Sequence, residues 1–561
     1  MGSIKRNYSI DFLKKNHLAI THLRQKMSEK KLVLCLGAGF SSQLKIPNWK
    51  KLVENIAKDN RVNGRTVLEN KELSLTTKIQ VLYETFKKNY KETDQYKENH
   101  EGNNLFFLDD DIIRERWIDI VWNCLYSDYG KLKESEREGR HEYLKEYIEI
   151  IEKSPVTVNY NFDDVIERMF DDRREEDAPR KYESTSRPSM QFKRNNCVIY
   201  HPNGYIPYNK ENSIEGNFVF SEKSFQDQLI DTISGRYNPL QYLFLSYTML
   251  FTGLSLDDPT LRHMLRKNAT LNPGHFHYYI YYIDKSRPTK IPSCEDMKAI
   301  KESYFETFNL VTLFLTGDEI KQLAQYINLN DDSFFKKNLQ CNKPRSYVFY
   351  VSGTPGTGKT SSLNQLTDFI IQDEFQDRHR DDLYQSYGKL NEEQRIELDK
   401  WIVNQFRIRN MHISDISKKS CIQLIDRSSI DPICFVDRKN ENALTIRAKE
   451  LKENYCIAGL EKGKVIILEA DARELFFRLN KRNPNNDDPQ KYNYPMSYIR
   501  DTLDNFRNLF PNSNYKHIDT TLKSKSTVVK EIAHEVFFGE YIEADLISQL
   551  DNYVTQVIAV H

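Results

Sequence analysis

A glycine-rich octapeptide with a lysine and a threonine, GTPGTGKT, spans Gly353–Thr360 and fits the pattern GxxxxGK[ST]. It follows the apolar run YVFYVS and precedes a helix-favouring stretch, the context in which this pattern binds phosphate. The backbone amides of such a loop surround a β-phosphate, Lys359 bridges the β- and γ-phosphates, and Thr360 holds Mg²⁺. The sequence therefore predicts a site for ATP and Mg²⁺ whose ligands are Gly353, Gly356, Gly358, Lys359, Thr360 and Ser361.

Charged side chains follow two later strands of the same half. The run CIQLID ends in Asp426 and Arg427, and KVIILEADARELFFRLNKR predicts a strand and a helix that carries Arg478 and Arg482. Four-residue spacing places these arginines on one helix face, where they could clamp a phosphate; two solvated arginines are the alternative. An Asp-Arg pair also occurs at Asp437 and Arg438 after a strand-like run, so Asp437 is an alternative to Asp426 as the functional strand-end aspartate. We prefer Asp426, because the helix start and the IDP sequence that follow it match better.

A second glycine turn, GAGFS at Gly37–Ser41, follows the apolar run LVLCL. Glycine lets one backbone approach another or a ligand, and the first amides of the next helix point at an anion. A tight turn is the alternative for this motif alone. Three more polar or small stretches also follow apolar runs, namely NYNFDD at 159–164, YHPNG at 200–204 and FTGLSLDDP at 251–259. Ligands bind outside the carboxyl ends of parallel strands, so we prefer one nucleotide site over four unrelated turns.

Apolar runs of strand length alternate with helix-favouring stretches along both halves of the chain, which predicts the α/β class with parallel sheets. Charged, helix-favouring segments occupy about residues 60–150, and within them Lys87–Asn104 has too little apolar content to pack and is predicted to be a solvated insertion or loop. A new strand begins at Tyr347, so the boundary lies near residue 340. The expected domains are residues 1–335 and a second, P-loop domain at 340–561.

The composition excludes several classes of protein. Lys plus Arg and Asp plus Glu both number 81, so no net field attracts nucleic acid or an anionic membrane. The eight cysteines contain no CxxC and read as buried thiols in a reducing cytosol, without zinc or disulfides. Neither a signal segment nor a myristoylation motif stands at the N-terminus, so we expect a cytoplasmic protein. The apolar stretch Leu240–Leu256 is predicted to be a buried helix and strand.

The N-terminal motifs occur in a known order. GAGxS, an IPxW segment, NFDD, an HxxG turn and GxSLxDP follow one another as in the sirtuin-like fold, and roughly residues 20–330 resemble that family. The resemblance implies a Rossmann-like domain with helical insertions that binds NAD and breaks its nicotinamide–ribose bond. By resemblance, NAD contacts Gly37, Ala38, Gly39, Phe40, Ser41, Asp163, Gly253, Ser255 and Asp257.

The same resemblance points to two catalytic residues. Asn161 would orient the ribose or the attacking water; Asn159 offers a register two residues earlier, but NFDDVIE matches at more positions. His201 would supply the base, although Asn203 occupies the place directly before glycine where the family has its histidine. A histidine that caps the turn is the alternative, and the domain would then only bind nucleotide. The four-cysteine zinc module of protein deacylases is absent, which favours water as the acceptor.

Roughly residues 345–540 resemble the P-loop nucleoside and nucleotide kinases, through the P-loop, the Asp-Arg pair after a strand and an arginine-bearing helix. By this resemblance Asp426 is the base or orients water, Arg427 contacts the acceptor, and Arg478 with Arg482 closes over the phosphates.

Fusion of the two parts predicts an NAD hydrolase gated by a nucleotide-sensing domain, as in sirtuin-like proteins of anti-phage defence. The expected partners are small nucleotides, a phage-derived trigger or partner protein, and further copies of the chain in a homo-oligomer. In one alternative the kinase-like half is the catalyst and the N-terminal half only reads NAD or an ADP-ribose-like ligand. In another, neither half turns over.

Overall fold

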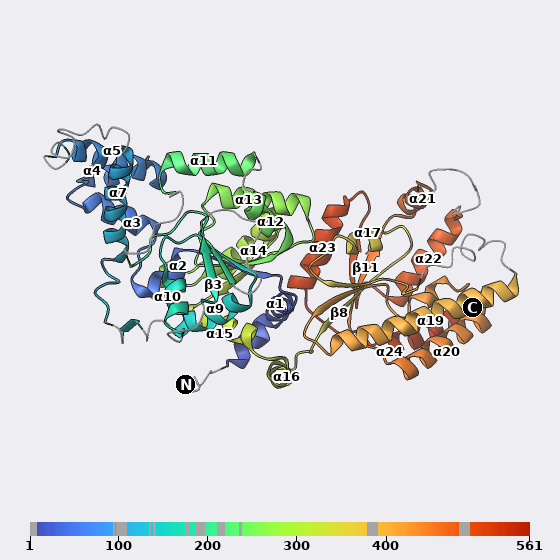
Figure 1. Cartoon of the computed structure of the whole chain (residues 1–561). Helices are drawn as coiled ribbons and strands as arrows, with labels where there is room; N and C mark the ends of the chain where they lie inside the picture. The colour runs from blue at the N-terminus through green and yellow to red at the C-terminus, as the bar shows by residue number, and fades with distance from the viewer. Residues whose placement is uncertain are drawn as a thin grey trace. The chain divides into compact units, whose positions relative to one another are not determined.

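The apolar runs of the first half form one parallel sheet in the computed structural model (Figure 1). The structure describes residues 8–93, 96, 109–133, 136–137, 142–174, 180–186, 197–209, 219–234, 238–377, 391–481 and 494–560. The strands of the first sheet are β1 (Leu32–Leu36), β2 (Val156–Asn159), β3 (Tyr182–Thr185), β4 (Cys197–Tyr200), β5 (Thr248–Thr252), β6 (His277–Tyr282) and β7 (Leu310–Leu315). Their order is β3-β4-β2-β1-β5-β6-β7, and every neighbouring pair is parallel.

A second parallel sheet follows in the order β12-β11-β8-β10-β9. Its strands are β8 (Tyr347–Ser352), β9 (Ile370–Gln372), β10 (Ile422–Asp426), β11 (Lys464–Glu469) and β12 (Lys516–Asp519). Every residue of β1, β5, β8 and β10 is buried, because a parallel sheet covered on both faces offers no polar side. The predicted α/β class with two parallel sheets is confirmed.

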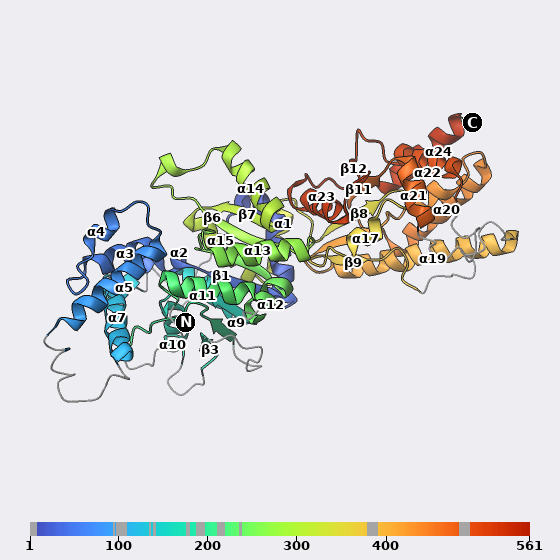
Figure 2. The same cartoon turned by 90° about the horizontal axis from the view of Figure 1, so that it is seen from above.

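Helices cover both faces of each sheet. On the first sheet α12, α13 and α14 lie on one face and α9 and α15 on the other (Figure 1). Helices α3, α4, α5 and α7 contact one another beside it, in both views (Figures 1 and 2). The helices up to residue 328 are α1 (Ile10–Ser28), α2 (Ala38–Ser41), α3 (Trp49–Lys58), α4 (Arg65–Glu69), α5 (Leu75–Lys91), α7 (Asp109–Tyr126), α9 (Glu142–Lys153), α10 (Val165–Asp171), α11 (Glu222–Ile233), α12 (Asn238–Ser246), α13 (Pro259–Leu271), α14 (Cys294–Phe308) and α15 (Gly317–Asn328).

The second sheet is covered on one face by α20, α22 and α24, whose apolar side chains join those of β8, β10 and β11 in one core. The remaining helices include α17, which begins at the P-loop lysine and packs on α23. These helices are α16 (Asp331–Gln340), α17 (Lys359–Leu363), α19 (Glu392–Ser417), α20 (Glu441–Ala458), α21 (Ala472–Lys481), α22 (Met496–Leu509), α23 (Lys525–Phe538) and α24 (Leu546–Val560).

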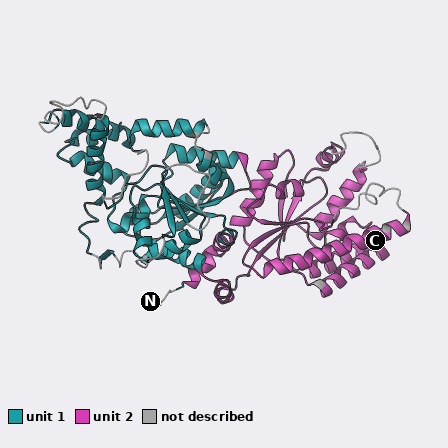
Figure 3. Cartoon of the chain, viewed as in Figure 1, with its two compact units in different colours: residues 1–8, 26–270, 276–328 teal, residues 9–25, 271–275, 329–561 magenta. Residues whose placement is uncertain are grey.

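The chain divides into two compact units (Figure 3). Unit 1 comprises residues 1–8, 26–270 and 276–328, and unit 2 comprises 9–25, 271–275 and 329–561. Two segments that the sequence-based division assigns to the first domain therefore cluster with the second. In unit 2, Gln25 accepts a hydrogen bond from the Ile422 amide at 2.9 Å, and His275 Nδ1 lies 2.7 Å from Asp368 Oδ1.

The eight cysteines are all free thiols. The prediction that they are buried holds for six and is wrong for Cys294 and Cys456, which lie on exposed parts of α14 and α20. Within the described residues, no helix has the length and apolar character that crossing a membrane requires.

Candidate functional site

Four neighbouring strands of the first sheet, β4, β2, β1 and β5, carry the four motifs at their carboxyl ends. Because these strands are parallel and adjacent, the turns that follow them meet at one edge of the sheet. Asn161, His201, Gly253 and the turn at 37–41 therefore lie at the same edge. The strand order reverses at β1, because β2 lies on one side of β1 and β5 lies on the other. Such a reversal is where open α/β sheets bind ligands.

Two glycine turns interlock at this edge. The amide of Gly37 donates to the Thr252 carbonyl at 3.0 Å, and the amide of Gly39 donates to the Gly253 carbonyl at 2.9 Å. A Cβ atom on Gly39 would lie 2.9 Å from the Gly253 Cα, and one on Gly253 would lie 2.4 Å from the Phe40 nitrogen. The glycines are thus required by contact between the two turns. The amides of Gly37 and Gly39 already donate to carbonyls of the other turn, so they are not available to a pyrophosphate. A pyrophosphate at this turn would instead lie against the exposed surface of Gly39.

A buried polar group lies beside the glycine turn. Ser41 Oγ donates to Asp163 Oδ1 at 3.0 Å, and Asn161 Nδ2 donates to Ser41 Oγ at 3.3 Å. Asn161 Oδ1 is buried and accepts no hydrogen bond from the described residues. Asn159, the alternative register, accepts the Asn161 amide at 3.1 Å and thereby shapes the turn. Of the two asparagines, Asn161 is the one whose side chain reaches the glycine turn.

His201 lies next to this group but is fully buried. Its Nε2 is 2.8 Å from Glu167 Oε1, and its Nδ1 is 3.3 Å from the Asn161 carbonyl oxygen. Ser184 Oγ donates to the same Glu167 oxygen at 2.6 Å, and the Tyr205 ring stacks on the imidazole at 4.4 Å. Burial acts to raise the pKa of Glu167, but the charge of His201 and the hydrogen bonds from His201 and Ser184 outweigh it, so this pKa is lowered. Both ring nitrogens of His201 are therefore engaged within the protein.

Asn203, which stands where the family has its histidine, is also buried. Its Oδ1 accepts a hydrogen bond from Gln228 Nε2 at 3.1 Å, and the next residue, Gly204, has a φ of 76°. Asn203 thus stabilises the turn against α11.

The remaining residues predicted to bind NAD differ in exposure. The Phe40 ring is buried against Tyr147 at 5.4 Å, so this side chain belongs to the core. Ala38 is half-buried, and Ser255 and Asp257 are exposed, with the Ser255 hydroxyl donating to the Asp257 carboxylate. A hydroxyl-bearing ligand could reach this pair beyond β5.

Asp163 should make the stability of unit 1 depend on pH. Burial raises its pKa to about 6 from 3.8. The folded chain then binds more protons than the unfolded chain between about pH 4 and 6, so this contribution to stability is lost as pH rises through that range. We expect Asp163→Asn to be stabilising by up to about 3 kcal/mol above pH 7 and nearly neutral at pH 4.5. Melting temperatures from pH 4.5 to 8 test this, and parallel curves for variant and wild type would contradict it.

In unit 2 the P-loop joins β8 to α17, and Gly353, Gly356 and Gly358 have φ values of 132°, 86° and 90°. Lys359 Nζ donates to the carbonyls of Gly353 and Thr354, each at 2.8 Å. Burial, with the nearby positive charge of Arg427, lowers the pKa of Lys359 to about 7. The loop has the backbone that phosphate binding requires, and its lysine is buried among backbone carbonyls.

Thr360 and Asp426 meet beside this lysine. The Thr360 hydroxyl donates to Asp426 Oδ2, and Asp426 Oδ1 is buried without a hydrogen bond from the described residues. Among the described residues no three His, Cys, Asp or Glu side chains form a metal cluster. A threonine and one carboxylate nevertheless suit Mg²⁺, which binds through few protein ligands, water and phosphate oxygens. The competing Asp437 is exposed, and its Oδ1 accepts the Lys439 amide at 3.0 Å.

Arg427 follows β10 and contacts the P-loop; its backbone has a φ of 72°. Its Nε is 2.7 Å from Glu374 Oε1, and its Nη1 donates to the Gly353 carbonyl at 3.1 Å. Asp431 accepts from Ser352 Oγ at 2.6 Å, and burial raises its pKa to about 6. Sequence reasoning did not assign Glu374 or Asp431. Glu374 follows β9, so the strand-end rule applied above could have found it.

Of the two arginines predicted to clamp a phosphate, the described residues include Arg478. Arg478 donates to the Thr520 carbonyl at 2.7 Å and to Glu474 Oε1 at 2.9 Å, and its Nη1 lies 3.4 Å from the Gly356 carbonyl. It therefore contacts the P-loop backbone. Arg482 lies outside the described residues. Ser361 is exposed on α17.

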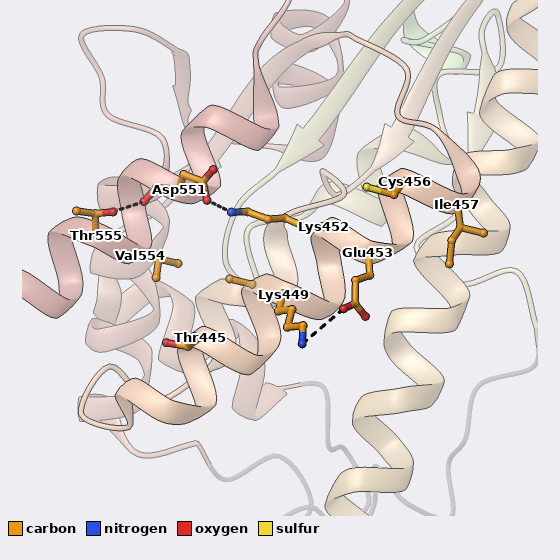
Figure 4. Close-up of a pocket in the computed structure, with 10 residues that line it drawn as sticks. Thr445, Lys449, Lys452, Glu453, Cys456, Ile457, Asp551, Val554 and Thr555 are labelled. Atoms are coloured by element: carbon orange, nitrogen blue, oxygen red, sulfur yellow. Dashed lines mark hydrogen bonds and ion pairs between the residues drawn. The ribbon is translucent and has the colours of Figure 1, made fainter.

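A surface groove of about 560 Å³ between α20 and α24 has none of these residues in its lining (Figure 4). In this groove Lys449 pairs with Glu453 and Lys452 pairs with Asp551, so these four charged side chains have partners within the protein.

Comparison with known proteins finds a similarity over part of the chain. Residues 155–311 match the family model of a SIR2-like domain. The match runs from the start of β2 into β7 and includes Asn161, His201 and Gly253, whereas the turn at 37–41 precedes it. No curated protein sequence matches this chain.

Solved structures of deoxyadenosine kinase and of thymidylate kinases align with about a third of the chain. Deoxyadenosine kinase from M. mycoides, solved with dCMP and dCDP, is 12% identical, with a TM-score of 0.27, over 34% of this chain and 97% of that one. Thymidylate kinase from Ehrlichia chaffeensis is 13% identical, with a TM-score of 0.24, over 34% and 99%. Thymidylate kinase from Candida albicans is 15% identical, with a TM-score of 0.24, over 36% and 96%.

Proposed function

We propose that unit 1 is an NAD⁺ hydrolase that cleaves the nicotinamide–ribose bond. The observation that carries this proposal is the buried group of Ser41, Asn161 and Asp163 at the meeting point of four strand ends, in which Asn161 Oδ1 accepts no hydrogen bond from the part of the chain that the structure describes. A buried amide oxygen without a partner costs free energy, so a bound hydroxyl or water at this position would be favoured. The SIR2-like match over residues 155–311 supports NAD as the ligand.

The reaction needs few groups. The bond between ribose C1′ and the nicotinamide nitrogen breaks, and its electron pair leaves with neutral nicotinamide. Water then adds to the oxocarbenium-like C1′, its proton passes to a base, and ADP-ribose is released. Asn161 would orient the water or the ribose hydroxyl, in surroundings dry enough to strengthen this contact. Asp163 and His201 are the titratable groups that lie beside Asn161.

Unit 2 would bind ATP with Mg²⁺ and gate the hydrolase. Lys359 would bridge the phosphates, and Thr360 with Asp426 would hold the metal. The chain itself offers a route for coupling: α13 begins directly after the loop that follows Gly253, and the residues at its end, 271–275, cluster with unit 2. There His275 pairs with Asp368, close in sequence to α17. A few kcal/mol of coupling would suffice for tight control.

The biological setting that we propose is cytoplasmic anti-phage defence. Unregulated loss of NAD would kill the host, so the hydrolase needs a trigger, either a nucleotide altered by infection or a phage-derived partner protein. Assembly into a homo-oligomer is part of this proposal.

A second candidate is a nucleoside or nucleotide kinase whose unit 1 only binds NAD or a related ligand. Glu374 and Arg427 favour it, since a carboxylate beside an arginine at a strand end, next to a P-loop, could accept a proton from an acceptor hydroxyl.

Released nicotinamide distinguishes these functions. The purified full chain is incubated with NAD⁺, with and without ATP, Mg²⁺ and candidate nucleosides, while nicotinamide and nucleoside phosphates are followed. For the hydrolase, we expect Asn161→Ala to reduce nicotinamide release by about 100-fold or more without changing ATP binding. Nucleoside phosphorylation that survives this change and is lost in Lys359→Ala would instead establish the kinase.

A further inference from the structure

The Glu167–His201 pair is a buried charge network outside the assigned binding groups. Glu167 is on α10, His201 follows β4, and both side chains are at most 8% exposed. Asp164, Tyr182 and Cys197 also interact electrostatically with Glu167, and each is an acidic group. Interaction with the imidazole, together with its hydrogen bond, lowers the pKa of this carboxyl against the effect of burial.

Hydrogen-bond chemistry assigns the protons of His201. A backbone carbonyl only accepts, so the contact of Nδ1 with the Asn161 oxygen requires an N–H on Nδ1. The pKa of Glu167 is lowered by His201 and Ser184 against the effect of burial, so this carboxyl is ionised near neutral pH and only accepts; its contact with Nε2 therefore also places an N–H there. With both nitrogens protonated, the ring has no lone pair for a substrate proton.

The hydrogen bond from His201 Nδ1 goes to the backbone carbonyl of Asn161, the residue that we propose orients the water or the ribose. Asn161 has its own amide held by Asn159 Oδ1, and the Val165 amide is held by Asp163 Oδ1. His201 adds an anchor at the Asn161 carbonyl and so restrains the turn that carries Asn161 and Asp163. Small displacements of a positioned group cost large factors in rate.

We propose that Glu167 and His201 are positioning residues: Glu167 holds His201 as an imidazolium, and His201 holds the Asn161 turn, so that His201 is not the general base. This inference rests on the proposed hydrolase. It leaves Asp163, whose carboxylate lies in the same group as Asn161, as the candidate base for the attacking water.

Substitutions that keep or remove an N–H donor at position 201 test it. His201→Gln and His201→Asn keep a donor for the Asn161 carbonyl but cannot exchange protons near neutral pH; His201→Ala removes both properties. We expect at least one amide variant to retain nicotinamide release within about tenfold of wild type, with an unchanged acidic limb in the rate–pH profile. Loss of about 100-fold is expected for His201→Ala, and about 30-fold in kcat, with KM nearly unchanged, for Glu167→Ala. Ser184→Ala removes one donor to Glu167 and should cost only a few-fold.

Hydrogen exchange of the turn provides a readout that needs no activity. The amides of Asn161 and Val165 should exchange faster in Glu167→Ala and His201→Ala and remain protected in the amide variant that retains activity. Amide variants as inactive as His201→Ala, while their turn stays protected, would overturn the proposal and make the imidazole the base. If wild type releases no nicotinamide under any nucleotide condition, the hydrolase itself fails, whereas the exchange data still decide whether Glu167 and His201 hold the turn.

Discussion

Replacing Gly253 by alanine is expected to abolish nicotinamide release and to destabilise unit 1 by about 3 kcal/mol or more. The residue has a φ of 71°, which alanine adopts at a cost of roughly 1 kcal/mol. Its new Cβ would lie 2.4 Å from the Phe40 nitrogen and 2.8 Å from the Gly39 carbonyl carbon. Both are backbone atoms of the neighbouring turn, so this turn must move, and Ser41 moves with it away from Asp163.

Gly317→Ala is the matched control for this change. It adds the same methyl group in unit 1, at the start of α15, where nothing lies within 4 Å. We expect its melting temperature and nicotinamide release to match wild type. ATP binding by unit 2 should survive in both variants, which separates a local collapse from failure of the whole chain to fold. An active, stable Gly253→Ala variant would show that the interlocked turns do not position Ser41.

Replacing Lys359 by methionine should raise the stability of the ligand-free protein and remove its response to ATP. Burial lowers the pKa of this lysine to about 7 from 10.5, so below pH 7 the folded state holds its charge at a cost of a few kcal/mol. Methionine removes that cost. Wild type at 100 times its Kd of ATP should gain about 2.7 kcal/mol, seen as a higher melting temperature, and Lys359→Met should gain none.

Proton uptake gives this prediction a second measurement. Phosphate oxygens beside Lys359 would raise its pKa, so ATP binding at pH 8 should take up protons, which calorimetry in buffers of different ionisation enthalpy detects. Lys418→Met is the control, because Lys418 is 73% exposed at the end of α19. This variant should behave as wild type in both measurements. Stabilisation of Lys359→Met by ATP equal to that of wild type would place the nucleotide elsewhere.

The motifs at strand ends were predictable from sequence because they depend on local chemistry. Buried parallel strands appear as unbroken apolar runs, and glycine or asparagine directly after such a run marks the edge where ligands bind. The stretches that contain Asn161, Asp163 and Gly253 were located in this way, and the roles of these residues came from the sirtuin-like resemblance. Lys359 and Thr360 came from the GxxxxGK[ST] pattern, and Asp426 from its place at a strand end. The sequence predicted that the four turns share one site, but it did not predict the order β4-β2-β1-β5 that makes them neighbours.

Contacts between distant segments were not predictable. Gly37 was expected to make room for a phosphate, but the structure places the Gly253 turn against it, a packing that no local pattern encodes. The sequence predicted no role for Glu167, the last residue of NFDDVIE, because its partner His201 lies 34 residues further along the chain. Likewise, the side chains of α1 that cluster with unit 2 find their partners beyond residue 330.

The sequence by itself determined the α/β class, the P-loop and the residues that lie at strand ends, because strand burial and turn chemistry act over a few neighbouring residues. Only the tertiary structure decided which of those residues touch, which groups His201 contacts and which segments belong to each unit. These properties depend on burial and on partners brought together across long stretches of chain, where a side chain's hydrogen bonds and pKa are set by neighbours that local sequence does not specify.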